Sequence, residues 1–193
     1  KGCLAESIRD DNPVVFIEHR LLYGIRSHVP AVPYEIPFGK ARQLAEGTDI
    51  TIVGISHMAV ESLRAHAYLE QVGISANVID PVSLSPLDID TIVASSSQTG
   101  RLLVVDNAWT NCGASAEIVA QVIERLQGQT EVSVRRMGYA PVPCPTTTNL
   151  EKLFYPNART IASSAFAMVH DDSKTWFPEA AEAPEITEFK GPF

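Results

Sequence analysis

Two polar pairs in the sequence combine residue types that can do acid–base or binding chemistry. Ser56-His57 directly follows one apolar run, and Asp106-Asn107 follows another, with Gly113 opening the next helical stretch. A histidine so placed can hydrogen-bond a substrate or transfer a proton, and a helix N-terminus can hold an anion. Both pairs also suit structural roles: an N-cap serine before an exposed histidine, and a loop that packs on a neighbouring subunit.

Two charged groups near the start of the chain offer further chemistry. The run from Asp10 to Asn12 supplies carboxylate, amide and backbone oxygens in a tight turn, which are the ligands of hard cations. His19, between Glu18 and Arg20, could serve as an acid–base group. The simpler interpretations are a helix C-terminus and a strand end with solvated charges.

Motifs that define a self-contained site are absent. The sequence has no GxGxxG, no GxxxxGK[ST], no GxSxG and no HExxH. Three cysteines (Cys3, Cys112, Cys144) are too few and too widely spaced for a disulfide framework or a CxxC zinc site, so we expect reduced, partly buried thiols. The residues alone therefore predict a domain without an active site of its own.

Hydrophobic periodicity predicts the elements that position these residues. Strands are predicted at 14–18, 50–55, 75–79, 102–105 and 131–135, the last as a half-buried edge strand. Helices are predicted at 1–9, 57–71, 87–94, 114–126 and 157–169, with Ser56 and Asn157 as N-caps and Gly73 as a stop. This alternation predicts an α/β fold: a mostly parallel sheet with helices on both faces, in which one antiparallel edge strand is possible.

Apolar stripes predict the core faces of two of these helices. The stripe of the 57–71 helix consists of Ala59, Val60, Leu63 and Ala67. That of the 114–126 helix consists of Ala116, Val119, Ala120, Ile123 and Leu126.

Composition restricts the classes of function. The chain has 193 residues, 45% of them hydrophobic and 20% charged, which is ordinary for a globular protein. No apolar run approaches the roughly 20 residues of a membrane span, and we see no signal peptide. A net charge of −8 argues against nucleic acid. A start at Lys1 without a methionine, inside a predicted helix, suggests a fragment or a processed subunit.

Several segments together resemble a known family. The opening KGCLAESIRDDNPVVFIEHRLLYG is similar to the end of the pyrimidine-binding domain in the beta subunit of 2-oxoacid dehydrogenase complexes. The segments IPFGKARQLAEGTDITIVGISHMAVESL, VIDPVSLSPLD, GRLLVVDNAWTNCGASAEIVAQVIERL and VRRMGYAPVPCPTTTNLEKLFYPNARTI resemble the transketolase C-terminal domain of the same subunit. The resemblance covers about residues 1–170.

This resemblance implies a division of the chain. Residues 1–23 would be the end of the pyrimidine-binding domain, 24–44 an interdomain linker, 45–170 a transketolase C-terminal-like domain, and 171–193 an acidic extended tail. The assembled enzyme would bind thiamine diphosphate and Mg between an alpha and a beta subunit. Because the family's cofactor glutamate and catalytic histidine precede the matched region, we assign no catalytic and no cofactor-binding residue to this chain.

One site is carried over by the resemblance. In related beta subunits, the turn that corresponds to SIRDDNP holds a monovalent cation, usually potassium, largely through main-chain oxygens. The matching residues here are Ser7, Ile8, Asp10 and Asn12.

The resemblance also implies partners and a location. These are an alpha subunit and a second beta subunit, in a heterotetramer, and the core of a dihydrolipoyl acyltransferase. The tail, with six acidic residues against two lysines, could attract a basic binding domain or could simply be solvated. We expect a cytoplasmic protein, or one of the mitochondrial matrix or plastid. Alternatives are a transketolase-like or deoxyxylulose-phosphate-synthase-like protein, a 2-oxoacid:ferredoxin oxidoreductase, and a non-catalytic assembly module.

Overall fold

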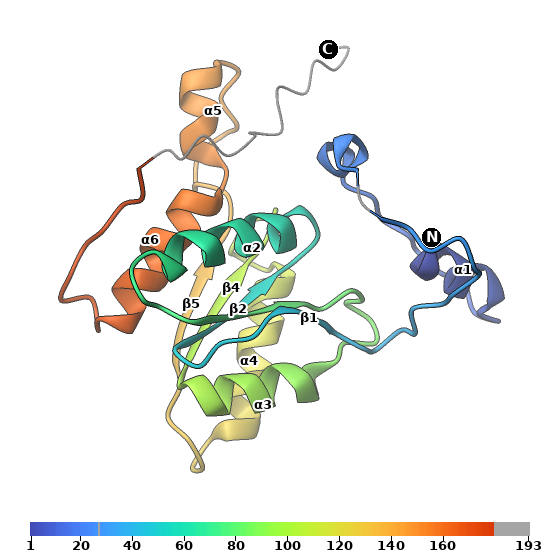
Figure 1. Cartoon of the computed structure of the whole chain (residues 1–193), viewed down its shortest axis with the longest axis horizontal. Coiled ribbons are helices and arrows are strands. Elements are labelled where there is room, and N and C mark those ends of the chain that lie inside the picture. The colour runs from blue at the N-terminus through green and yellow to red at the C-terminus, as the bar shows by residue number, and fades with distance from the viewer. Residues whose placement is uncertain (27, 180–193) are drawn as a thin grey trace.

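The computed structural model describes residues 1–26 and 28–179 (Figure 1). Five strands form one sheet in the order β1-β3-β2-β4-β5. Their bounds are Arg42–Ala45 (β1), Ile50–Gly54 (β2), Ala76–Asp80 (β3), Arg101–Val105 (β4) and Ser133–Met137 (β5). β1 is antiparallel to β3, and all other pairs are parallel. The predicted mostly parallel sheet is confirmed, and its antiparallel edge strand is β1. The 131–135 strand begins two residues later than predicted, as β5 at the other edge.

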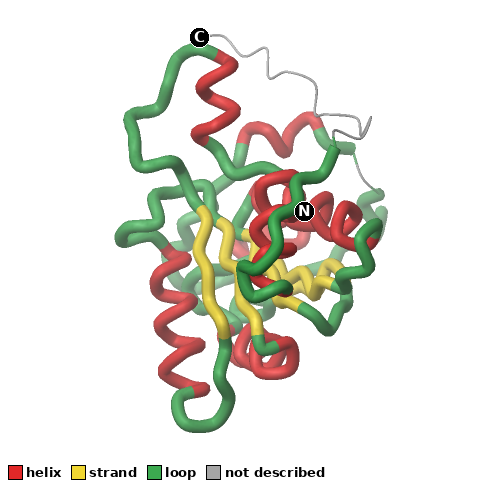
Figure 2. Tube along the Cα trace, turned by 90° about the vertical axis from the view of Figure 1, so that its left-hand side faces the viewer, coloured by secondary structure: helices red, strands yellow, loops and turns green. Residues whose placement is uncertain are grey.

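Helices cover both faces of the sheet, as predicted (Figure 2). The helices are α1 (Gly2–Arg9), a 3-10 helix (Arg20–Gly24), α2 (His57–Glu70), α3 (Ile89–Thr99), α4 (Ala114–Leu126), α5 (Thr148–Phe154) and α6 (Ala158–Val169). On one face, α2 and α6 pack through side chains such as Leu69 and Ile161. On the other, α3 and α4 pack through side chains such as Ile92 and Val122. Every residue of β2 is buried, because the central strand is covered on both faces. Within the described residues, no helix is long and apolar enough to cross a membrane.

The predicted core faces of α2 and α4 are right only in part: Ala59 and Leu126 are buried as predicted. Leu63 is 40% exposed and Ile123 is 39% exposed, whereas both were expected to point inward. The buried face of α2 consists of His57, Met58, Ala59, Glu61, Ser62, Ala65 and Leu69. That of α4 consists of Ser115, Ile118, Val122 and Leu126. Both buried faces contain polar residues, so the apolar stripe in the sequence is rotated away from the true core face.

The last helix of the α/β body (β1 to α6) forms where the sequence predicts it. Asn157 caps α6: its side chain accepts from the backbone N–H groups of Arg159 and Thr160, and Thr160 completes a capping box. The short helix α5, which we did not predict, projects from the body (Figure 1). Residues 171–179 form a turn and then irregular backbone, and the remainder of the tail lies outside the described residues.

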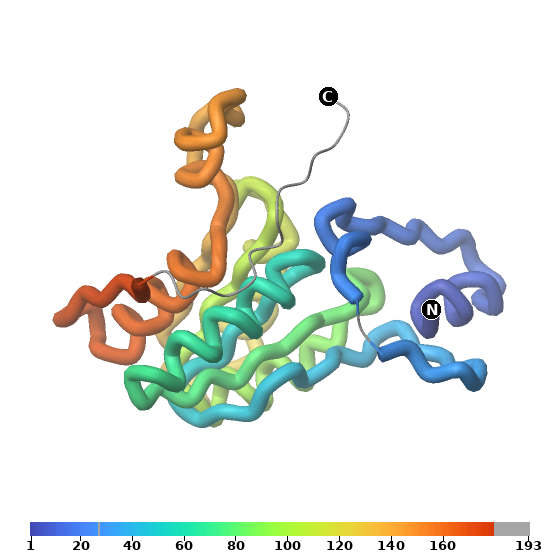
Figure 3. The backbone as a smooth tube through the Cα atoms, turned by 45° about the horizontal axis from the view of Figure 1, so that its top comes forward, coloured from blue at the N-terminus to red at the C-terminus, as the bar shows by residue number. Residues whose placement is uncertain are grey.

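The predicted strand at 14–18 does not form. These residues are irregular, and Val15 and Ile17 are 85% and 84% exposed. A strand needs a neighbour to pair with, and no described residue of this chain provides one. We call residues 1–26 the N-terminal segment; it lies beside the α/β body rather than within it (Figures 1 and 3).

Candidate functional site

The sequence places two polar groups at one edge of the sheet. β2 and β4 are parallel neighbours with Gly54 opposite Val105, so the residues after them emerge side by side. Ser56 holds a left-handed φ of 58° and occupies the N-cap position of α2 without a side-chain capping bond. Gly54 permits this sharp turn, because a Cβ there would lie 2.5 Å from the Met58 carbonyl oxygen. His57 is buried after this turn. The structural interpretation of this pair, an N-cap serine before an exposed histidine, predicted that His57 would be exposed.

His19 completes a cluster at this edge. Its Nε2 lies 2.8 Å from Nδ2 of Asn107, and its ring stacks on that of His57 with centroids 4.9 Å apart and an interplanar angle of 13°. The sequence pointed to these three residues separately, and the fold brings them together. The cluster joins the N-terminal segment to the first residue of α2 and to the residues after β4.

Glu61 supports the cluster from within α2. Its exposed fraction is only 7%, so the residue is buried. One carboxylate oxygen accepts from Arg64 at 2.7 Å and lies 3.9 Å from Nε2 of His57. The other accepts from the backbone N–H of Ala158 at 2.8 Å, at the start of α6. Glu61 therefore connects the histidine cluster to the N-terminus of α6.

Burial sets the charge state of the two histidines. It lowers the pKa of His57, a shift that the carboxylate of Glu61 opposes, and it lowers the pKa of His19. His57 Nε2, His19 Nδ1 and Asn107 Oδ1 are buried and have no hydrogen-bond partner among the described protein atoms. Both imidazoles are thus held in an environment that favours the neutral form.

Asp106 shows that the start of α4 is not a free anion site. Its side chain is 93% buried, and burial raises its pKa, although the backbone N–H of Asn107 opposes this. A Cβ on Gly113 would lie 3.8 Å from the carboxylate and 2.4 Å from the Trp109 carbonyl oxygen, so the loop is closely packed. A carboxylate at this position would repel a second anion, which favours a structural role.

The residues of the predicted cation turn lie together at the C-terminal end of α1. Asp10 Oδ1 accepts from the backbone N–H of Asn12 at 2.7 Å and from its Nδ2 at 3.0 Å. The hydroxyl of Ser7 turns back to the Cys3 carbonyl oxygen at 2.8 Å. Ser7 and Ile8 stand in the last turn of the helix, where carbonyl groups have no intrahelical donor. No group of three or more His, Cys, Asp or Glu side chains within residues 1–26 and 28–179 could hold a metal, so any cation here would depend on main-chain oxygens.

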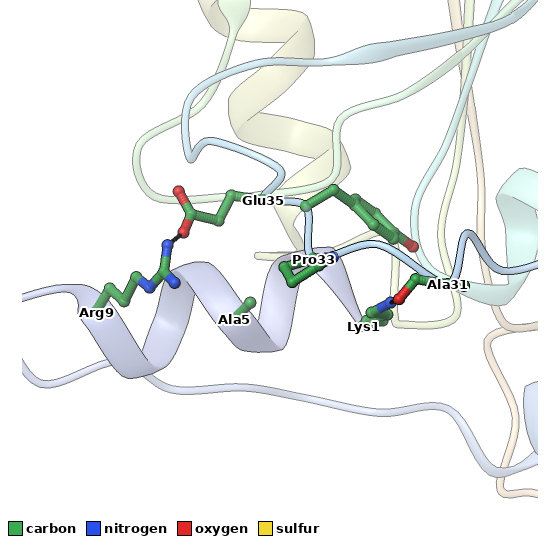
Figure 4. Close-up of a pocket in the computed structure, with 7 residues that line it drawn as sticks. Lys1, Ala5, Arg9, Ala31, Pro33 and Glu35 are labelled. Atoms are coloured by element: carbon green, nitrogen blue, oxygen red, sulfur yellow. Dashed lines mark hydrogen bonds and ion pairs between the residues drawn. The ribbon is translucent and has the colours of Figure 1, made fainter.

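A cavity of about 420 Å³ opens beside α1 but excludes this turn (Figure 4). Arg9 pairs with Glu35 across it, and Lys1 Nζ donates to the carbonyl oxygens of residues 30–32 at 2.6–3.1 Å. The cavity is therefore the gap between α1 and the chain that folds back along it.

Comparison with known proteins identifies the α/β body. The model of the family described as "Transketolase, C-terminal domain" matches residues 39–161. The chain belongs to the transketolase C-terminal domain family. Its similarity extends to a solved structure titled "Split gene transketolase, inactive beta4 tetramer", with a TM-score of 0.63, 28% identity, and coverage of 75% of this chain and 48% of that one.

Curated relatives match a longer part of the chain than the family model does. The chain is 41% identical over 165 residues to the beta subunit of acetoin:2,6-dichlorophenolindophenol oxidoreductase from Cupriavidus necator, covering 86% of this chain and 49% of that protein. It is 42% identical over 166 residues to the pyruvate dehydrogenase E1 component subunit beta of Bacillus subtilis (86% and 51%). It is 41% identical over 174 residues to the mitochondrial counterpart of Pisum sativum (88% and 48%). The chain spans about half the length of these relatives.

The transketolase C-terminal domain contains most of the histidine cluster, because His57, Glu61 and Asn107 lie within the matched residues. Sequence reasoning missed Glu61, although its spacing four residues after His57 was a usable signal.

An aromatic group around α5 was also missed. The ring of Phe154 stacks on that of Tyr139 and meets that of Tyr155 edge to face, and the Cys144 thiol lies 3.4 Å from the Tyr155 hydroxyl. That hydrogen bond, with burial, raises the pKa of Tyr155 to about 12. The three cysteines are free; Cys112 and Cys144 are exposed, contrary to the expected partial burial.

Proposed function

We propose that the chain is the C-terminal part of the beta subunit of a thiamine-diphosphate-dependent 2-oxoacid dehydrogenase. The observation that carries this is the identity of 41–42% to pyruvate dehydrogenase beta subunits from a bacterium and a plant, over 86–88% of this chain. The match is longer than the 39–161 stretch that the family model covers. The assembled enzyme would decarboxylate a 2-oxoacid oxidatively and pass the acyl group to lipoamide.

We propose that this chain contributes to the assembly of the enzyme complex. The proposed division is 1–23 (end of the pyrimidine-binding domain), 24–44 (linker), 45–170 (transketolase C-terminal-like domain) and 171–193 (acidic tail). The proposed partners are the alpha subunit, a second beta subunit and the acyltransferase core. The family model supports a transketolase C-terminal-like domain in the later part of the chain, and its match begins at residue 39, six residues before the proposed boundary.

The described residues do not fit thiamine diphosphate and Mg by themselves. They contain no group of three or more acidic, histidine or cysteine side chains able to hold a metal, and the sequence has no glycine-rich phosphate loop. We therefore derive no catalytic step within this chain.

The potassium site is part of the proposal. Its support is the end of α1, where Ser7 and Ile8 stand in the last helical turn and Asp10 and Asn12 form the turn that follows. Potassium accepts such oxygen ligands, and Asp10 and Asn12 already fix the turn by their mutual hydrogen bonds.

Acetoin cleavage is a second candidate for the whole enzyme. The chain is as similar to the Cupriavidus necator acetoin oxidoreductase beta subunit, at 41% identity, as to the pyruvate dehydrogenase subunits. The two reactions would differ in residues that bind substrate, which we place outside this chain.

One experiment tests function and substrate together. The complete beta subunit is co-expressed with its alpha subunit, and reduction of 2,6-dichlorophenolindophenol is measured with pyruvate, branched-chain 2-oxoacids or acetoin, in potassium or choline buffer. We expect thiamine-diphosphate-dependent activity with a 2-oxoacid, and a loss of activity in choline. Activity with acetoin alone would select the second candidate. Tight binding of thiamine diphosphate and Mg to residues 1–193 alone, measured by calorimetry, would contradict our placement of the cofactor site.

A further inference from the structure

We propose that His19, His57 and Asn107 form a pH-sensitive latch, which holds the N-terminal segment on the α/β body while both imidazoles are neutral and weakens when they are protonated. The proposal concerns how two parts of the chain are held together. It does not depend on the reaction that the assembled enzyme catalyses.

The hydrogen bond between Asn107 and His19 requires a neutral ring. The amide nitrogen Nδ2 donates to His19 Nε2 over 2.8 Å, so that ring nitrogen must carry a lone pair. The proton of the neutral imidazole then sits on Nδ1. Protonation would place a second N–H on Nε2, and two donors would face each other across the contact.

The stack between the rings adds a second constraint. The rings of His19 and His57 lie nearly parallel at 4.9 Å, and His57 is 93% buried. Two imidazolium rings in this position would repel each other, and each would lose hydration.

The surrounding charged groups do not offset the cost of protonating both rings. From α2, Glu61 faces His57 at 3.9 Å, but it already accepts from Arg64 and from the Ala158 N–H. Arg64 itself disfavours the imidazolium. Beside His19 in the sequence, Glu18 accepts a hydrogen bond from the Tyr23 phenol, and the next residue is Arg20. From the β4–α4 loop, the buried Asp106 precedes Asn107, and burial raises its pKa, which limits its charge at low pH.

The direction of the pH effect follows from the lowered pKa of both histidines. When docking favours the neutral ring, the docked state loses stability relative to the released state as pH falls below the ordinary value of 6.5. Well above pH 6.5 the rings are neutral in both states, and the latch is closed. For one linked proton, the docking equilibrium changes by up to about tenfold per pH unit.

Hydrogen exchange on the whole chain tests the latch. Protection factors, which correct for the intrinsic pH dependence of exchange, are measured for residues 18–25 between pH 8 and pH 5.5. We expect protection there to fall several-fold below pH 6.5, while the amides of β2 and β4 keep theirs. Unchanged protection of residues 18–25 would overturn the proposal.

Two variants separate the latch from a general effect of acid. In Asn107→Asp the carboxylate accepts from protonated His19, so protection should rise as pH falls, the reverse of the parent chain. In His57→Phe the stacked ring stays but cannot be protonated, so the pH dependence should weaken. His66→Gln, a change at another α2 histidine, which pairs with Glu70, should behave as the parent chain does. If Asn107→Asp follows the parent curve, the proposal is wrong.

A spectroscopic measurement guards against variants that do not fold. The imidazole pKa values of His19 and His57 are obtained by NMR titration of the unmodified chain. Both should lie below 6.5 in the docked state. A value above 6.5 at either ring would contradict the latch.

Discussion

At the scale of single residues, Glu61 determines how two distant stretches of the chain meet. Its carboxylate lies on α2, yet it accepts the N–H of Ala158, 97 residues later, and also binds Arg64. The first N–H groups of a helix have no partner within the helix, so a buried carboxylate both satisfies one and matches the positive end of the helix dipole. Removal of the carboxylate leaves a buried donor without its acceptor.

We therefore expect Glu61→Ala to lower the free energy of unfolding by about 2–3 kcal/mol, as for other hydrogen bonds to charged groups. Glu61→Gln retains an acceptor for Ala158 and should cost less. Urea denaturation measures both. Glu70→Ala is the control, because Glu70 is exposed on the same helix and should change stability by less than about 0.5 kcal/mol. Equal effects at Glu61 and Glu70 would show that the buried network contributes nothing.

At the scale of elements, the sequence predicts features that depend on residues close together in the chain. It misses features that depend on contacts between residues far apart in the chain. The central strands are predicted because runs such as that of β2 are apolar and β-branched. Most of the core face of α2 is missed because its inward side contains the polar residues Glu61 and Ser62, and the partner of Glu61 is the distant Ala158. For the same reason, His19, His57 and Asn107 could each be named from the sequence, but the meeting of His19 with Asn107 could not be predicted.

Asp88 offers a test at this scale, because it joins β1 to α3. Its carboxylate caps α3 by accepting from the Thr91 N–H, and it also accepts from the Ala41 N–H beside β1. Burial alone would raise its pKa, but these hydrogen bonds lower it. Asp88→Ala should cost about 1–2 kcal/mol at neutral pH, in the range of a lost N-cap. Since the ionised form is favoured in the fold, this difference should shrink as pH falls below 3.8.

The neighbouring Asp90 provides the control for Asp88. It lies in the first turn of the same helix, with a side chain that is 87% exposed and paired with Arg125 at the surface. Asp90→Ala should lower the free energy of unfolding by no more than about 0.5 kcal/mol. Thermal or urea unfolding of the two variants, from pH 7 to pH 3, separates a structural cap from a surface ion pair. A pH-independent loss at Asp88 would count against the assigned cause.

At the scale of the whole molecule, two parts of the chain differ in how well they bury their apolar residues. The α/β body encloses its strands between helices on both faces, whereas the N-terminal segment leaves Val15 and Ile17 more than four-fifths exposed. The apolar pattern of residues 14–18 is that of a buried strand, and the sequence prediction failed there because a strand is defined by its neighbours. An exposed, uncharged, β-branched run is a site where chains pair with one another.

The chain of residues 1–193 should therefore self-associate through residues 14–17 as its concentration rises. Val15→Lys and Ile17→Lys place charges on this run and should shift the onset of association, measured by light scattering, to higher concentration. Leu153→Lys is the matched control: Leu153 on α5 is 77% exposed, but it belongs to a helix whose backbone groups are already paired. Equal effects of all three substitutions would mean that added charge, and not strand pairing, prevents association. In the complete beta subunit, where we propose that the run is buried as a strand, the same two lysines should instead destabilise the fold.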